Sequence, residues 1–147
     1  MKVRVLLVDD EKEFVEALAE RLSMRDYDVT VSLNGEDAIN KLTKYNFDVV
    51  ILDVRMPGMD GTDVLREMKN IKPLTEVIML TGHATVESAI DGMRRGAYDY
   101  LMKPCKTEDL VDKINKAHKK KAEHEQRIRD AKVKEIIDSP RAALRES

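Results

Sequence analysis

The sequence predicts an α/β fold in which helices cover both faces of a five-stranded parallel sheet, an architecture called doubly wound. Residues 49–52 are four consecutive apolar residues, a pattern typical of a strand that is buried on both faces. Segments with strand and helix patterns alternate five times along the chain. This alternation favours a parallel sheet with right-handed crossovers.

Five short segments have the apolar pattern of strands and are bounded by polar or turn residues. In the second of them apolar and polar residues alternate, so we expect this strand at an edge of the sheet. In chain order the five segments span residues 3–8, 27–31, 49–52, 76–80 and 97–102.

Five segments with helical spacing follow these strands. Asn34-Gly35 precedes the second, Pro73 ends the third, Gly96 closes the fourth, and Thr107 is expected to be the N-cap of the fifth. The residues that we expect to face the sheet are, in chain order, Phe14, Val15, Leu18, Leu22, Ala38, Ile39, Leu42, Val64, Leu65, Met68, Val86, Ala89, Ile90, Met93, Leu110, Val111 and Ile114.

We expect one domain over residues 1–118, followed by a helical extension or linker over residues 119–147 with a disordered end. Residues 113–135 are dense in Lys, Arg and Glu and contain no Gly or Pro, which favours helix. An unbroken helix from Thr107 to about Glu135 would be roughly 40 Å long. Its apolar seam is interrupted at Lys121 and His124, so we do not expect a strong isolated coiled coil. We expect the run of residues 119–121, all lysines, to be a solvated helix end.

The composition is that of a globular protein with no bias toward nucleic acid or membrane surfaces. It is 42% hydrophobic and 37% charged, with a net charge of −2 and one cysteine, Cys105. No stretch has the length and apolarity of a membrane span or a signal peptide. We therefore expect a cytoplasmic chain that contacts neither membrane nor nucleic acid directly.

Chemically versatile residues stand where the predicted strands end. The first strand is followed by Asp9-Asp10, the third by Asp53, the fourth by Thr81 and the fifth by Lys103. In a parallel sheet these ends share one edge, where doubly wound folds bind their ligands, and in the common strand order 2-1-3-4-5 the first, third and fourth strands are neighbours. Crowded carboxylates repel each other unless a cation intervenes, and Mg²⁺ prefers such oxygen ligands.

A carboxylate nucleophile beside a metal, a lysine and a hydroxyl group is suited to phosphoryl transfer. The metal and Lys103 would neutralise charge on the phosphoryl oxygens, and Asp53 would form an acyl phosphate. We therefore predict that Asp53 is the phosphoryl acceptor, with Thr81 and Lys103 beside it.

These blocks resemble the receiver domain of two-component response regulators. The residues that carry the resemblance lie in the order and spacing of that family, cover roughly the first 118 residues, and are Val8-Asp9-Asp10, residues 52–61, Leu80-Thr81-Gly82 and residues 98–104. The resemblance implies a flavodoxin-like fold with the strand order 2-1-3-4-5.

The resemblance also implies roles for single residues. Asp53 would accept phosphate from a sensor histidine kinase. Mg²⁺ would be bound by Asp10, by Asp53 and by the backbone carbonyl of Arg55, with Asp9 acting through water. Thr81 and Lys103 would bind the phosphoryl oxygens, and the bond between Lys103 and Pro104 would be cis.

A conformational switch follows from the same resemblance. Thr81 would move toward the phosphoryl group and the ring of Tyr100 would turn inward. The face made by the fourth helix, fifth strand and fifth helix, together with the C-terminal helix, would then control a protein partner or an effector domain.

Two other classes of function use similar folds. Haloacid-dehalogenase-type phosphatases need a second carboxylate two residues after the nucleophile, and this chain has Arg55 there. Flavodoxin-like or nucleotide-binding modules are not favoured, because neither GxGxxG nor GxxxxGK[ST] is present. We therefore expect a signalling phospho-acceptor that assists only its own phosphorylation and dephosphorylation, rather than an enzyme.

The output of such a receiver is left open by the sequence. Residues 82–86, Gly-His-Ala-Thr-Val, resemble receivers of the sigma-54-dependent activator class, so the chain could be the receiver piece of a longer activator. Alternatively, it acts alone by binding another protein. In the first case the C-terminal helices of two chains would pair as a homodimer.

Overall fold

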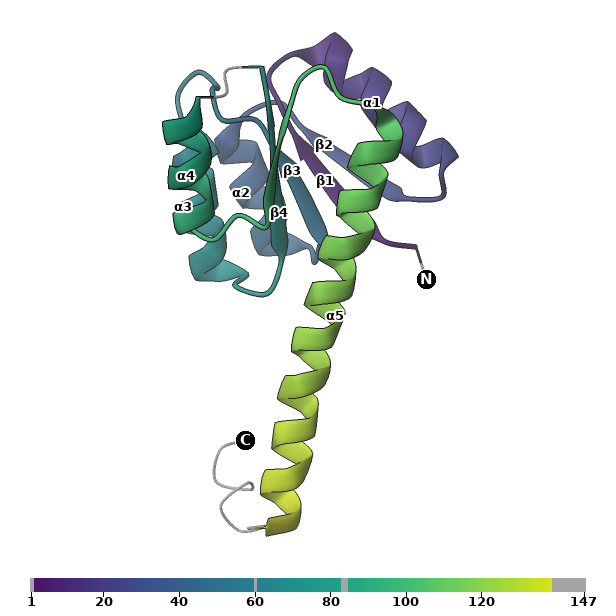
Figure 1. Cartoon of the computed structure of the whole chain (residues 1–147), viewed down its shortest axis with the longest axis vertical. Helices are drawn as coiled ribbons and strands as arrows, with labels where there is room; N and C mark the ends of the chain where they lie inside the picture. Colours follow the sequence, from purple (N-terminus) through teal and green to yellow (C-terminus); the bar gives the residue numbers. More distant parts are fainter. Residues whose placement is uncertain (1, 60, 83–84, 139–147) are drawn as a thin grey trace.

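The computed structural model describes residues 2–59, 61–82 and 85–138 and confirms the predicted fold (Figure 1). All strand pairs are parallel, in the order β2-β1-β3-β4-β5, so the second strand is an edge strand as predicted. The strands are β1 (Arg4–Val8), β2 (Asp28–Ser32), β3 (Val49–Leu52), β4 (Glu76–Thr81) and β5 (Asp99–Met102), and the helices are α1 (Lys12–Met24), α2 (Gly35–Lys44), α3 (Gly61–Ile71), α4 (Val86–Arg94) and α5 (Thr107–Asp138).

The sheet separates two apolar clusters because successive strand residues point to opposite faces. In β1, Leu6 and Val8 belong to the cluster that α2 and α3 cover, whereas Val5 and Leu7 belong to the one that α1 and α5 cover. Every residue of β3 and β4 is buried, which explains why the central strands consist almost wholly of apolar residues.

Helix α4 packs against the sheet with a different face from the predicted one. Ile90 and Met93 were expected to face the sheet, but they are 47% and 46% exposed. Gly92 is buried instead, and a Cβ atom there would lie 3.6 Å from Cγ of Met79 in β4. The helix therefore approaches the sheet through a residue without a side chain, and this leaves two of its large apolar residues outside.

Helix α5 has two environments. Leu110, Ile114 and Ala117 are fully buried against the sheet, and the helix then continues away from the domain (Figure 1). The predicted long helix is confirmed, although Thr107 is its first residue rather than the residue before it. None of the helices within the described ranges is long and apolar enough to cross a membrane.

The sequence suggested that the lysines of residues 119–121 form a solvated helix end, and this holds for Lys119 only, because Lys120 and Lys121 form ion pairs with the domain and α5 continues beyond them. Lys120 Nζ lies 3.6 Å from Oε2 of Glu76, and Lys121 Nζ lies 3.4 Å from Oδ1 of Asp48. The Glu76 side chain is only 4% exposed, and its Oε2 has no hydrogen-bond partner among the described residues. Because a buried charge needs compensation, Lys120 helps to hold α5 at the amino-terminal edge of the sheet.

We expect Lys120→Ala to lower the free energy of unfolding by about 1–2 kcal/mol, since it leaves the Glu76 carboxylate without this counter-ion. The effect should stay below the ~3–5 kcal/mol of a fully buried pair because Lys120 is half exposed. The neighbouring Lys119, whose side chain is 78% exposed, gives a matched control, and Lys119→Ala should change stability by less than about 0.5 kcal/mol. Urea denaturation of the full chain measures both, and equal effects would contradict the assignment.

Candidate functional site

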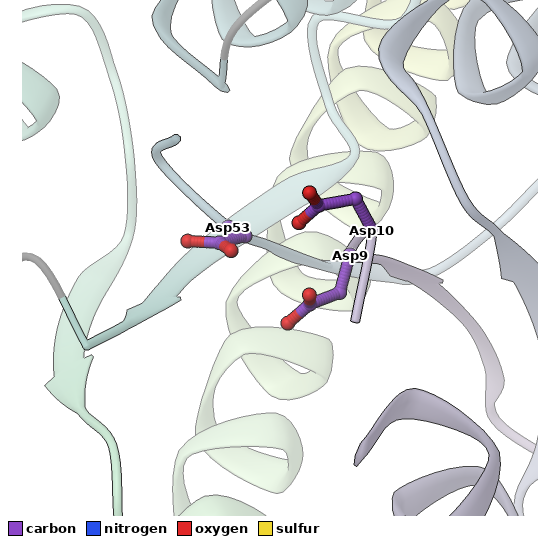
Figure 2. A group of neighbouring side chains, drawn as sticks. All are labelled: Asp9, Asp10 and Asp53. Carbon is purple, nitrogen blue, oxygen red and sulfur yellow. The ribbon is translucent and has the colours of Figure 1, made fainter. Parts of the chain in front are cut away.

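Three carboxylates from two strand ends converge at the carboxyl edge of the sheet. Oxygen atoms of Asp9, Asp10 and Asp53 all lie within 4.8 Å of one another, and Figure 2 shows the three side chains grouped together. Asp9 and Asp53 are buried, whereas Asp10 is exposed. The predicted convergence of the acidic residues is therefore present, with an opening to solvent on the side of Asp10.

The backbone fixes both acidic segments. The amide of Asp53 donates to the carbonyl of Val8 at 3.0 Å, which extends the pairing of β3 with β1. After Asp53 the chain turns back, and the amide of Gly61 donates to the carbonyl of Val54 at 2.8 Å. A Cβ atom on Gly61 would collide with the Asp53 carbonyl, so this close approach requires glycine.

Lys103 is the cation of the site. Its Nζ lies 2.6 Å from Oδ2 of Asp9, 3.1 Å from Oε1 of Glu11 and 3.7 Å from Oδ2 of Asp53. Burial is the largest single influence and lowers the pKa of Lys103, but the hydrogen bonds to Asp9 and Glu11 and the negative charges of Asp9 and Asp53 together outweigh it, so that pKa is raised. The lysine is therefore firmly protonated.

The buried carboxyl group of Asp9 has a raised pKa. Burial raises its pKa, while hydrogen bonds from Lys103 and from the Glu11 amide act in the opposite direction. The net shift is upward, so the charged form of Asp9 is incompletely compensated by protein groups. An additional cation at this edge would stabilise the charged form of Asp9.

The other predicted residues lie around this centre. Thr81 is fully buried at the end of β4, and its carbonyl accepts a hydrogen bond from the Lys103 amide at 2.9 Å. The bond between Lys103 and Pro104 is cis, as predicted. Arg55 is exposed, and its amide faces Oδ1 of Asp53 at 3.4 Å. Tyr100 is half-buried, packs on the cluster of α2 and α3, and its hydroxyl has no hydrogen-bond partner among the described residues.

Two residues of the site were missed by the sequence interpretation. Besides Glu11, the ring of Phe14 lies under Lys103, with 4.2 Å between Nζ and the ring centroid. The only signal was that Glu11 continues the acidic pair and that Phe14 follows one helical turn later. Nothing in the sequence places either beside a lysine 90 residues further along the chain.

The donor set suits a hard divalent cation. It consists of carboxylate oxygens alone, it carries more negative charge than Lys103 neutralises, and it is open at Asp10. Such a site favours Mg²⁺ over zinc, which usually takes nitrogen or sulfur ligands. The arrangement can therefore bind a metal and neutralise an anionic group placed on Asp53.

Known proteins resemble this chain in sequence and in fold. The family model of the response regulator receiver domain matches residues 5–115. The regulatory protein AtoC of Escherichia coli is 36% identical over 107 residues, which are 73% of this chain and 23% of AtoC. A receiver domain protein of Clostridium thermocellum superposes with a TM-score of 0.78 and 35% identity, over 82% of this chain and 97% of its own.

A further solved structure and the lengths of the relatives complete the comparison. A CheY-like receiver domain protein of Methanospirillum hungatei superposes with a TM-score of 0.81 and 27% identity, over 84% of this chain and 99% of its own. The chain spans only about a quarter to a half of the length of the curated relatives that it matches. From these matches and the geometry at the carboxyl edge, the chain belongs to the response regulator receiver domain family.

Proposed function

We propose that this chain accepts a phosphoryl group on Asp53 from the phosphohistidine of a sensor kinase. The observation that carries the proposal is the placement of the Asp53 carboxylate between two further acids and the Lys103 ammonium group. In this step an Asp53 oxygen attacks phosphorus as the bond from phosphorus to the histidine nitrogen breaks, and the histidine leaves as the neutral base after taking up a proton.

The surrounding residues would bind and orient the phosphoryl group. Lys103 would pair with one phosphoryl oxygen and the Thr81 hydroxyl would donate to another. When bound by Asp10, Asp53 and the Arg55 carbonyl, with Asp9 acting through water, Mg²⁺ would neutralise charge on the phosphoryl oxygens. The chain would act on itself only, as a signalling phospho-acceptor in the cytoplasm, and not as an enzyme with turnover.

The output would be a change of partner. Large apolar residues are exposed on the two elements of the proposed output face: Ile90 and Met93 of α4 and Met102 of β5 are 47%, 46% and 56% exposed. In this scheme residues 1–118 are the receiver and residues 119–147 join it to an effector or a second chain.

A place within a longer sigma-54-type activator is a second candidate for the output. The length of relatives such as the transcriptional regulatory protein ZraR of Salmonella typhimurium, of which the matched region is 26%, favours it. Of the motif that suggested this class, His83 and Ala84 lie outside the described residues. The exposed aliphatic residues of α5 also favour pairing of two chains; they are Ile128, Val133, Ile136 and Ile137.

Acetyl phosphate with Mg²⁺ should add one phosphoryl group to the full chain, and hydroxylamine should remove it because the product is an acyl phosphate. Asp53→Asn should abolish the labelling, since the amide is a poor nucleophile. Asp28→Asn, at the opposite edge of the sheet, is the matched control and should label normally. Intact-mass spectrometry measures all three, and labelling of the Asp53→Asn variant would contradict the assignment.

Mg²⁺ should raise the thermal unfolding midpoint of the wild-type chain, because binding to the native state adds stability, about 2.7 kcal/mol at a hundred times the dissociation constant. In Asp10→Asn the rise should be much smaller, since a direct ligand is lost and one repulsion is relieved before metal is added. Calorimetry with Mg²⁺ and with a chelator compares the two. An equal rise in both would exclude Asp10 as a ligand.

If α5 pairs two chains, light scattering should give a dimer mass for the wild type in at least one of the two states, with or without beryllium fluoride. The double variant Ile136→Ser/Ile137→Ser should then lose mass toward the monomer, because it removes exposed aliphatic residues from the helix. The control is Lys132→Ser/Lys134→Ser, from the same turns. A monomer mass in both states, or equal loss in both variants, would contradict pairing through α5.

A further inference from the structure

We propose that Glu11 is a positioning residue that holds the Lys103 ammonium group in a resting place and thereby opposes the binding of a phosphoryl group at Asp53. This inference rests on the proposed function of Asp53. Glu11 is outside the predicted set of metal and phosphoryl ligands, and it would lower the affinity of the site for an anion.

The ammonium group of Lys103 has a defined resting place. Its two shortest contacts are to Asp9, at 2.6 Å, and to Glu11, at 3.1 Å, and the ring of Phe14 lies against it at 4.2 Å. The distance to Asp53, 3.7 Å, exceeds that of a good hydrogen bond. The lysine is therefore hydrogen-bonded to Asp9 and Glu11, while Asp53 stands at the longer distance of an ion pair.

Glu11 is directed toward the lysine by its backbone. It is the N-cap residue of α1, yet its side chain makes no capping hydrogen bond with the helix. Its amide instead donates to Oδ1 of Asp9 at 2.9 Å, while Oδ2 of the same Asp9 accepts from Lys103. Asp9 therefore links Glu11 and Lys103. At this N-cap position a short polar side chain would accept a hydrogen bond from the helix, whereas the Glu11 carboxylate accepts one from Lys103.

Two effects of Glu11 act in the same direction. A phosphoryl oxygen on Asp53 would compete with Glu11 for the Lys103 ammonium group, which now donates to Asp9 and Glu11. The Glu11 carboxylate opposes this competition, and its negative charge also repels the phosphoryl group. Glu11 is 59% exposed. Its removal should strengthen anion binding by about twofold to fivefold, which corresponds to about 0.4–1 kcal/mol and lies in the upper part of the range for an exposed ion pair.

The test is the affinity of the full chain for beryllium fluoride, a phosphoryl mimic, measured by fluorine NMR at saturating Mg²⁺. Glu11→Gln should bind about twofold to fivefold more tightly than wild type. Glu11→Asp keeps the charge but shortens the side chain by one methylene, so it should also bind more tightly if the contact with Lys103 matters. Glu13→Gln removes an exposed charge from the first turn of α1 and is the matched control, with affinity near that of wild type.

Each outcome decides a different point. Unchanged or weaker binding by Glu11→Gln, or an equal gain in Glu13→Gln, would overturn the inference. Wild-type affinity in Glu11→Asp would also overturn it, because charge alone would then be responsible. If the wild-type chain binds no beryllium fluoride, the proposed function of Asp53 fails instead. Thermal unfolding of each variant verifies that the fold is kept, as expected for an exposed side chain.

Discussion

Mutual repulsion of the acids at the carboxyl edge is the constraint on which the rest of the site depends. Asp9 and Asp53 are buried within 4.8 Å of each other and of Asp10, in surroundings where their charges are poorly screened. The sheet tolerates this because backbone hydrogen bonds fix both segments and Lys103 supplies one positive charge. The site remains short of positive charge, and this shortage is the reason why we propose that it binds a divalent cation.

At the amino-terminal edge of the same sheet, acidic side chains are compensated in a different way. There Glu76 is as deeply buried as Asp53, but it faces Lys120 of α5, and Asp48 faces Lys121. Each of these two acids has its own lysine on α5. One strand, β4, joins the two edges, from Glu76 at its start to Thr81 at its end. At the carboxyl edge, in contrast, Asp9 and Asp53 share the single lysine Lys103.

The sequence was sufficient for the fold and for the acidic centre because both depend on local patterns. Apolar runs locate the central strands, and the residue after each run is placed at the carboxyl edge by the parallel geometry alone. The misplaced residues depend on contacts between distant elements. Ile90 and Met93 were assigned to the sheet because periodicity cannot show that Gly92 makes the close contact.

The pairing of Lys103 with Glu11 and that of Lys120 with Glu76 were beyond sequence reasoning for the same reason. Glu11 and Lys103 are far apart in the sequence, and Glu76 and Lys120 are also well separated, though less so. A lysine run or a glutamate after an acidic pair has the same local pattern whether it is solvated or paired. Only the tertiary arrangement distinguishes the two, so the sequence located the acids that define the site but not Glu11 and Phe14, which also contact its lysine.

The extension of α5 gains its order from the domain. A free helix of this composition is marginal in water because its first turn is costly to form, whereas addition to an existing turn is not. The buried part, from Leu110 to Ala117, provides the existing turns, and the pairs of Lys120 and Lys121 hold the helix where burial ends. Beyond that point pairs one turn apart, such as Gln126 with Asp130, add small increments. The helix is therefore continuous from the domain into the extension. A conformational change in the receiver would be transmitted along it as long as the ion pairs of Lys120 and Lys121 stay formed.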